Sequence, residues 1–182
     1  MIPIVMPTDA QRVICDGFLI TARAELGMHE APGERDTPRV LEYLRTVSKP
    51  AWARLGLLHD ATPWCSAFAN WTVIKNALQG TGKANARSWL KWGEAIEEPI
   101  PGCLVVYSRP PTPWSGHVHF FDRFEGKETI RTVGGASMRV ADHVVGVGGN
   151  QGNAVSLKAY PGSRVLGYRV PRHADIRPEM TS

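Results

Sequence analysis

The segment Pro99-Ile-Pro-Gly102 divides the chain into two parts of different character. Before it, apolar residues recur at helical spacing; after it come short β-branched and aromatic runs separated by Gly, Pro and Ser. Helices followed by strands predict an α+β fold, with N-terminal helices packed on a small antiparallel sheet. A chain of 182 residues can bury one core, so we expect a single domain over residues 1–172 and a tail over 173–182.

Four helices are predicted before or near this boundary. The first spans residues 9–27 with Thr8 or Asp9 as its N-cap, the second opens at Pro38, and a short one covers residues 85–92. The remaining helix starts near Pro63, and its apolar residues follow the i, i+3, i+4, i+7 pattern of one buried face. These residues are Trp64, Ala67, Phe68, Trp71, Ile74 and Leu78.

Five strands are predicted after the boundary, and each is short. They are Cys103–Ser108, His117–Arg123, Thr129–Val133, His143–Val147 and Val165–Val170.

The irregular segment 48–63 contributes Trp52 and Leu55, which we expect to pack against the core.

Composition and charge exclude several classes of function. The formal charge of +4 comes from scattered residues without a Lys/Arg run, which argues against a nucleic-acid groove. No stretch approaches the ~18 apolar residues of a membrane span, so no integral membrane contact is expected. The first residues lack a basic, apolar secretory signal, which predicts synthesis in the cytoplasm and delivery by another route.

The three cysteines are predicted to play different roles. Cys15 and Cys103 lie in apolar segments and read as small buried hydrophobes, although a disulfide between them stays open. The cysteine spacings contain no CxxC and no zinc-ligand pattern, so neither a metal nor a cofactor is expected. Cys65 is left as the odd thiol.

Cys65 is predicted to be a nucleophile because Pro63 places it in the first turn of a helix. The unpaired N–H groups and the dipole of a helix N-terminus stabilise a thiolate, and the same groups can stabilise an oxyanion. Cys65 lies roughly 100° around the helix from Trp64, at the edge of the buried face. The alternative is an ordinary packed core cysteine.

A histidine and an amide are the predicted partners of this thiol. His117 and His119 point to the same face of a strand, and Gly116 would allow close approach of the helix, which favours His117 as the base. His119 is given a structural role. Asn150 follows Gly148-Gly149 and is the candidate for orienting the imidazole; the alternative is a turn Asn with local backbone bonds.

These residues belong to a longer series of motifs in a shared order. The pieces are Ala24-Glu-Leu-Gly27 with Glu30, Pro38-Arg-Val-Leu-Glu-Tyr43, Pro63-Trp-Cys-Ser-Ala-Phe68 with Asn70-Trp71, Ala86-Arg-Ser-Trp-Leu90 with Trp92-Gly93, Pro101-Gly102, Gly116-His-Val118, Gly148-Gly-Asn-Gln151 with Ala154-Val155, and Gly167-Tyr-Arg169 with Pro171. The series resembles the papain-like peptidoglycan hydrolases of the NlpC/P60 and CHAP superfamily. It is most similar to the subgroup associated with phages and prophages.

The resemblance implies a papain-like fold with Cys65 as nucleophile, His117 as base and Asn150 as third member. It implies cleavage of an amide bond in cell-wall peptides, as an amidase or endopeptidase, without a metal. A phage lysin released through a holin, a virion-borne hydrolase or an injected effector would suit the missing signal. We expect a monomer whose substrate is bacterial peptidoglycan, with an immunity protein or virion components as candidate partners.

Three departures from the family pattern stand out. Cys103 replaces the usual Asp after Pro-Gly, His119 occupies a position that is more often small, and a second pair, Gly134-Gly135, precedes Gly148-Gly149. Two rival functions remain open: a hydrolase acting on a protein or isopeptide bond, and a non-catalytic wall-binding or virion module.

Overall fold

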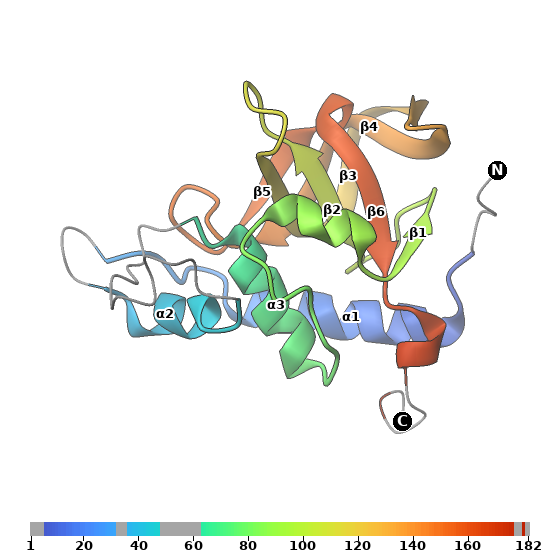
Figure 1. Cartoon of the computed structure of the whole chain (residues 1–182). Helices are drawn as coiled ribbons and strands as arrows, with labels where there is room; N and C mark the ends of the chain where they lie inside the picture. Colours follow the sequence, from blue (N-terminus) through green and yellow to red (C-terminus); the bar gives the residue numbers. More distant parts are fainter. Residues whose placement is uncertain (1–5, 32–35, 48–62, 177–179, 181–182) are drawn as a thin grey trace.

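The computed structural model describes residues 6–31, 36–47, 63–176 and 180. Its α-helices are α1 (Asp9–Ala24), α2 (Pro38–Leu44) and α3 (Cys65–Lys75). All three lie on one side of a six-stranded antiparallel sheet, below it in Figure 1. The α+β prediction is confirmed, and the arrangement is consistent with a papain-like domain. The predictions for Trp52 and Leu55 lie outside the described residues.

The sheet has the strand order β1-β6-β2-β3-β4-β5, and every neighbouring pair is antiparallel. The strands are β1 (Glu94–Ile96), β2 (Leu104–Ser108), β3 (Gly116–Val133), β4 (Ala136–Gly148), β5 (Ser156–Pro161) and β6 (Val165–Val170). The start of β3 therefore lies between β2 and β4, near the centre of the sheet. Tyr107 of β2 is in register with His117.

The strand predictions differ from the structure in three respects. One is that the predicted strand His143–Val147 is the C-terminal part of the longer strand β4 (Ala136–Gly148). Residues His117–Arg123 and Thr129–Val133 were expected as two strands but form the single long strand β3, which pairs with β4 from Phe120 to Val133. Register shifts after Phe121 and Glu125 interrupt the alternation of apolar residues and obscured this continuity. Strands β1 and β5 were not predicted, because β1 has three residues and β5 is a largely exposed edge strand.

Two predicted helix starts are confirmed. Thr8 caps α1 through a reciprocal pair of bonds: its Oγ1 accepts from the Gln11 N–H at 3.2 Å, and Gln11 Oε1 accepts from the Thr8 N–H at 2.9 Å. Pro38 opens α2. Helix α1 ends at Ala24, earlier than expected, and the predicted helix 85–92 is a 3₁₀ helix over Ala86–Lys91.

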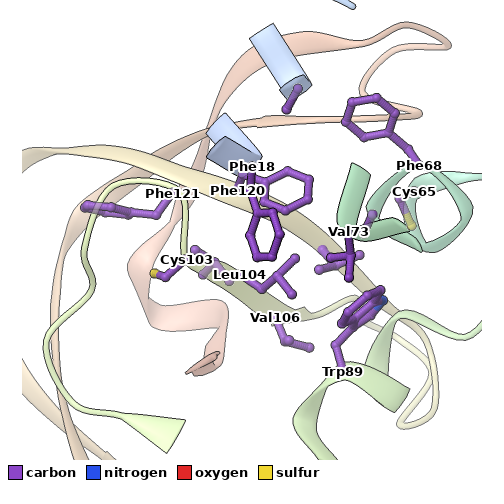
Figure 2. Close-up of a cluster of buried hydrophobic side chains, with 14 of the residues drawn as sticks. Phe18, Cys65, Phe68, Val73, Trp89, Cys103, Leu104, Val106, Phe120 and Phe121 are labelled. Atoms are coloured by element: carbon purple, nitrogen blue, oxygen red, sulfur yellow. The ribbon is translucent and has the colours of Figure 1, made fainter. Parts of the chain in front are cut away.

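The core lies between the helices and the facing side of the sheet. Phe120 of β3 packs against Phe18 of α1 and Phe68 of α3, with ring centroids 5.8 and 6.3 Å apart (Figure 2). Helix α3 is buried on all sides from Cys65 to Val73, as expected for a helix enclosed by other elements. The prediction for Ile74 was wrong: it is 47% exposed, because α3 emerges from the core at its C-terminal end.

Polar side chains join the three helices to one another. The Glu25 carboxylate accepts two hydrogen bonds from Arg39, at 2.6 and 2.8 Å, and one from the Tyr43 hydroxyl. Nearer the start of α3, the Trp64 indole donates to Glu30 Oε1 at 2.6 Å. The bond to Glu30 fixes Trp64, the residue that immediately precedes Cys65.

Candidate active site

Helix α3 begins at Cys65, two residues after the predicted start at Pro63, so Cys65 lies in the first turn as expected. Trp64 is its N-cap residue and makes no side-chain capping bond, so the first-turn N–H groups are not capped by a side chain. Burial raises the pKa of Cys65, and the nearby backbone N–H groups of Ser66 and Val118 offset part of this shift. The thiol thus lies where the start of α3 meets strand β3 (Figure 2).

His117 lies in β3 next to the residue that approaches the thiol. The backbone of Val118, which lies near the Cys65 sulfur, directly follows His117. The Tyr160 ring of β5 lies 4.7 Å from the His117 ring between centroids. Burial raises the pKa of Tyr160 to about 12, and the negative charge of a nearby Cys65 thiolate adds to this shift. One cluster therefore combines a thiol from α3, an imidazole from β3 and a phenol from β5.

Gln151, rather than Asn150, hydrogen-bonds to His117. Gln151 Oε1 lies 2.9 Å from His117 Nε2, whereas no side-chain hydrogen bond of Asn150 is found within the described part of the chain. Asn150 has a left-handed backbone conformation, with φ of 55°. This conformation turns the chain so that the next residue, Gln151, is buried beside His117, while Asn150 is half-buried. Asn150 was expected to bond to His117, but the next residue along the chain makes this bond.

Gln151 is held so that its carbonyl oxygen faces His117. Its amide nitrogen donates to the Ser156 carbonyl at 2.5 Å and approaches the Gly146 carbonyl at 3.4 Å. Because carbonyl oxygens only accept hydrogen bonds, the Gln151 NH₂ group must point toward them, and Oε1 must accept from His117. Nε2 of neutral His117 therefore carries the proton, and Nδ1 keeps the lone pair of a base.

The glycines before this turn allow it to lie against the start of α3. A Cβ atom on Gly149 would lie 2.4 Å from the Trp64 ring and 2.6 Å from the Phe68 Cβ. Gly116 is also needed for close approach, but to other elements than expected. A Cβ there would meet the Tyr107 carbonyl oxygen at 2.7 Å and the Arg87 side chain at 3.1 Å, rather than α3.

Burial keeps both candidate catalytic groups neutral at rest. Desolvation raises the pKa of the Cys65 thiol, and the backbone N–H groups offset this only in part. Desolvation also lowers the pKa of His117 to about 4, although the hydrogen bond that His117 donates to Gln151 opposes the shift. The sequence predicted a thiol pKa below its usual value; the structure places it above, because the enclosing core outweighs the helix N-terminus.

His119 lies deeper in the sheet than His117. It is fully buried, and its Nε2 lies 2.7 Å from the Tyr107 hydroxyl. Its Nδ1 has no hydrogen-bond partner of normal geometry among the described residues. Burial lowers its pKa well below the usual range, so it is a neutral imidazole inside the protein.

A cavity of about 230 Å³ opens beside His117. The described residues that line it are Tyr107, Ser108, Arg109, His117, Asn150, Gly152, Lys158, Tyr160 and Arg164. Cys65 keeps 7% of its surface exposed, whereas Cys15 and Cys103 have none. Of the three cysteines, only Cys65 retains any exposed surface.

The three cysteines are free and buried, so the Cys15–Cys103 disulfide left open by the sequence is not formed. Within residues 6–31, 36–47, 63–176 and 180, no group of three or more His, Cys, Asp or Glu side chains could hold a metal ion. None of the helices in the same ranges combines the length and apolar character needed to cross a membrane.

Comparison with known proteins gives one match. Residues 58–136 match the family model of the CHAP domain, and this range contains Cys65 and His117 but ends before Gln151. No curated protein matches the chain, and no solved structure matches it. The match supports the CHAP part of the resemblance seen in the sequence. The narrower likeness to NlpC/P60 proteins and to the phage subgroup stays a prediction.

Proposed function

We propose that this chain, whose CHAP-domain match includes both Cys65 and His117, is a cysteine hydrolase that cleaves an amide bond in the peptides of bacterial peptidoglycan. The observation that supports the proposal is that Cys65 begins α3 close to the backbone of Val118, the residue after His117, while the Gln151 carboxamide sets the tautomer of that imidazole. CHAP domains are typically cysteine- and histidine-dependent amidases or peptidases.

In the first step, the Cys65 thiol attacks the carbonyl carbon of the scissile amide. His117 Nδ1 takes the thiol proton as the C–S bond forms, which avoids a free thiolate in a buried site. The carbonyl π electrons move to oxygen, and the first-turn N–H groups of α3 can stabilise this oxyanion. Gln151 accepts a hydrogen bond from Nε2 throughout and holds the ring in position.

In the second step, the imidazolium of His117 returns its proton to the leaving nitrogen. The C–N bond breaks, an amine departs and a thioester on Cys65 remains. A water molecule then attacks the thioester with His117 as base, which releases the carboxylic acid and restores the thiol. Atoms and charge balance without a metal or cofactor in either step.

A phage or prophage lysin is the biological role that best fits this chemistry and the sequence resemblance. The chain would act at the cell wall after release through a holin, as part of a virion or as an injected effector. In this role it needs no partner for catalysis, and an immunity protein or virion components would be its candidate partners.

The test is digestion of purified sacculi with identification of the products by mass spectrometry. The wild-type chain should release muropeptides, whereas Cys65→Ala should release none and keep its fold by circular dichroism. Cys15→Ala makes the same change at a buried thiol outside the site and should retain activity. Lysis by Cys65→Ala at the wild-type rate would refute the mechanism.

The same digestion separates the rival functions. A hydrolase of protein or isopeptide bonds would leave the sacculi intact and cleave protein substrates in a Cys65-dependent reaction. A wall-binding module would sediment with sacculi without releasing products. Identification of the new termini among released products also distinguishes an amidase from an endopeptidase.

A further inference from the structure

We propose that Arg109, Lys158 and Arg164 form an anion subsite beside His117, which selects substrates with a free carboxylate next to the scissile amide. This inference rests on the proposed function and names the class of substrate that the same site takes. The subsite occupies the wall of the cavity that contains His117 and Tyr160.

The charge of this cavity is not balanced. Arg109, Lys158 and Arg164 are exposed side chains that come from three separate segments of the chain. None of them has an ion-pair partner among the described residues, and no Asp or Glu belongs to the described lining. Elsewhere on the surface, other arginines are paired: Arg23 with Asp122, Arg39 with Glu25 and Arg139 with Glu98.

The positive charge acts directly on the reacting groups. Burial has the largest effect on three pKa values: it raises those of Cys65 and Tyr160 and lowers that of His117. The charge of Arg109 acts to lower all three. Lys158 also lowers the pKa of His117. Its ammonium group lies 5.7 Å from the centre of the Tyr160 ring, which places it over the aromatic wall of the site.

An anionic substrate compensates this charge. Arginine and lysine bind carboxylates through charge-assisted hydrogen bonds, which are stronger than neutral ones and stronger still out of bulk water. The peptides of peptidoglycan offer such groups, because their acidic residues carry a carboxyl that is free in some walls and amidated in others. The subsite therefore predicts a preference for the free acid.

The experiment uses two muropeptides that differ at one stem-peptide carboxyl, free in one and amidated in the other. Their hydrolysis by the wild-type chain is compared, and their binding to Cys65→Ala is measured by calorimetry. We expect the free acid to bind about tenfold more tightly or better, and its advantage to shrink between low and physiological salt. Hydrolysis should show the same preference mainly in KM.

The double variant Lys158→Gln/Arg164→Gln should lose the preference while it still hydrolyses the amidated peptide. Lys127→Gln/Arg172→Gln is the matched control, because both residues are exposed cations outside the cavity lining. It should keep the preference.

The experiment distinguishes failure of the anion subsite from failure of the proposed function. Equal binding of the two peptides to Cys65→Ala, or an undiminished preference in the double variant, would overturn the anion subsite even if hydrolysis requires Cys65. Failure of the wild-type chain to hydrolyse either peptide would count against the proposed function, while the binding comparison would still decide the subsite.

Discussion

The Oε1 atom of Gln151 lies 2.9 Å from Nε2 of His117, and this contact determines which imidazole nitrogen can act as a base. The two residues are 34 positions apart: His117 lies in β3, and Gln151 lies in the turn between β4 and β5. Because the Gln151 amide nitrogen is committed to backbone carbonyls, its oxygen is the atom left to accept from His117. A neutral carboxamide thus orients the ring without adding a charge.

Replacement of Gln151 should damage catalysis more than replacement of Asn150. In Gln151→Ala the imidazole loses its fixed tautomer, and we expect kcat to fall by about tenfold to a hundredfold. Asn150→Ala removes a side chain of the cavity wall and should act chiefly on KM. Steady-state kinetics on a soluble muropeptide measure both effects. A larger loss of kcat in Asn150→Ala would restore Asn150 as the orienting group.

Activity should persist to a low pH and then decline. The pKa of His117 is lowered to about 4, so the neutral imidazole that the mechanism needs is the main form above this pH. The acid limb of kcat/KM should therefore lie well below pH 6.5. Gln151→Glu places a carboxylate beside Nε2, which favours the imidazolium and should move this limb to higher pH. An unmoved limb would mean that another group sets it.

The fold should lose stability as the pH falls below about 6.5. The pKa of buried His119 is lowered well below its ordinary value, so the unfolded chain takes up a proton that the folded chain does not. Each such histidine contributes a slope of up to about 1.4 kcal/mol per pH unit, between its unfolded and folded pKa values. In His119→Gln, the slope of the unfolding free energy against pH should be smaller by the contribution of one proton. Urea unfolding at several pH values measures this slope.

The link between α1 and α2 should respond to loss of charge at Glu25. Hydrogen bonds from Arg39 lower the pKa of the Glu25 carboxyl, so its contribution is present above about pH 4.5 and is lost as the pH falls further. Glu25→Gln should cost about 1–2 kcal/mol of unfolding free energy at pH 7 and less at pH 3. Glu125→Gln changes an exposed carboxylate and serves as the control.

Alkylation should distinguish the three thiols. Iodoacetamide should modify Cys65 first, because Cys15 and Cys103 have no exposed surface. The raised pKa of Cys65 means that the rate should increase steeply toward alkaline pH rather than level off below pH 8. Peptide mapping after timed labelling provides the measurement. A plateau at acidic pH would show that an ion pair with His117 exists at rest.

The sequence predicted the position of the thiol well, because local signals determine a helix start. Pro63 and the apolar spacing after it place Cys65 in the first turn, where the structure has it. The strand that carries His117 was similarly readable from its β-branched and aromatic residues.

The position of Gln151 was not readable in this way. A turn has no period, so one residue in a left-handed conformation, here Asn150, decides which neighbour faces the histidine. Strand β5, which supplies Tyr160 and Lys158, was missed because an exposed edge strand needs few apolar residues. The pKa of Cys65 depends on how completely the core surrounds it, which helix position alone does not specify.

Strand β5 pairs with β4 on one side and, within the described part of the chain, has no strand on the other. The backbone amide hydrogens of an edge strand exchange with solvent when the strand unfolds locally. This local unfolding costs less free energy than global unfolding. Tyr160 and Lys158 would move with these openings, while Cys65 and His117 remain in the protected centre. One wall of the cavity is therefore more mobile than the elements that carry Cys65 and His117. Hydrogen exchange should resolve the backbone amides of β5 and those around Cys65 and His117 as separate kinetic classes.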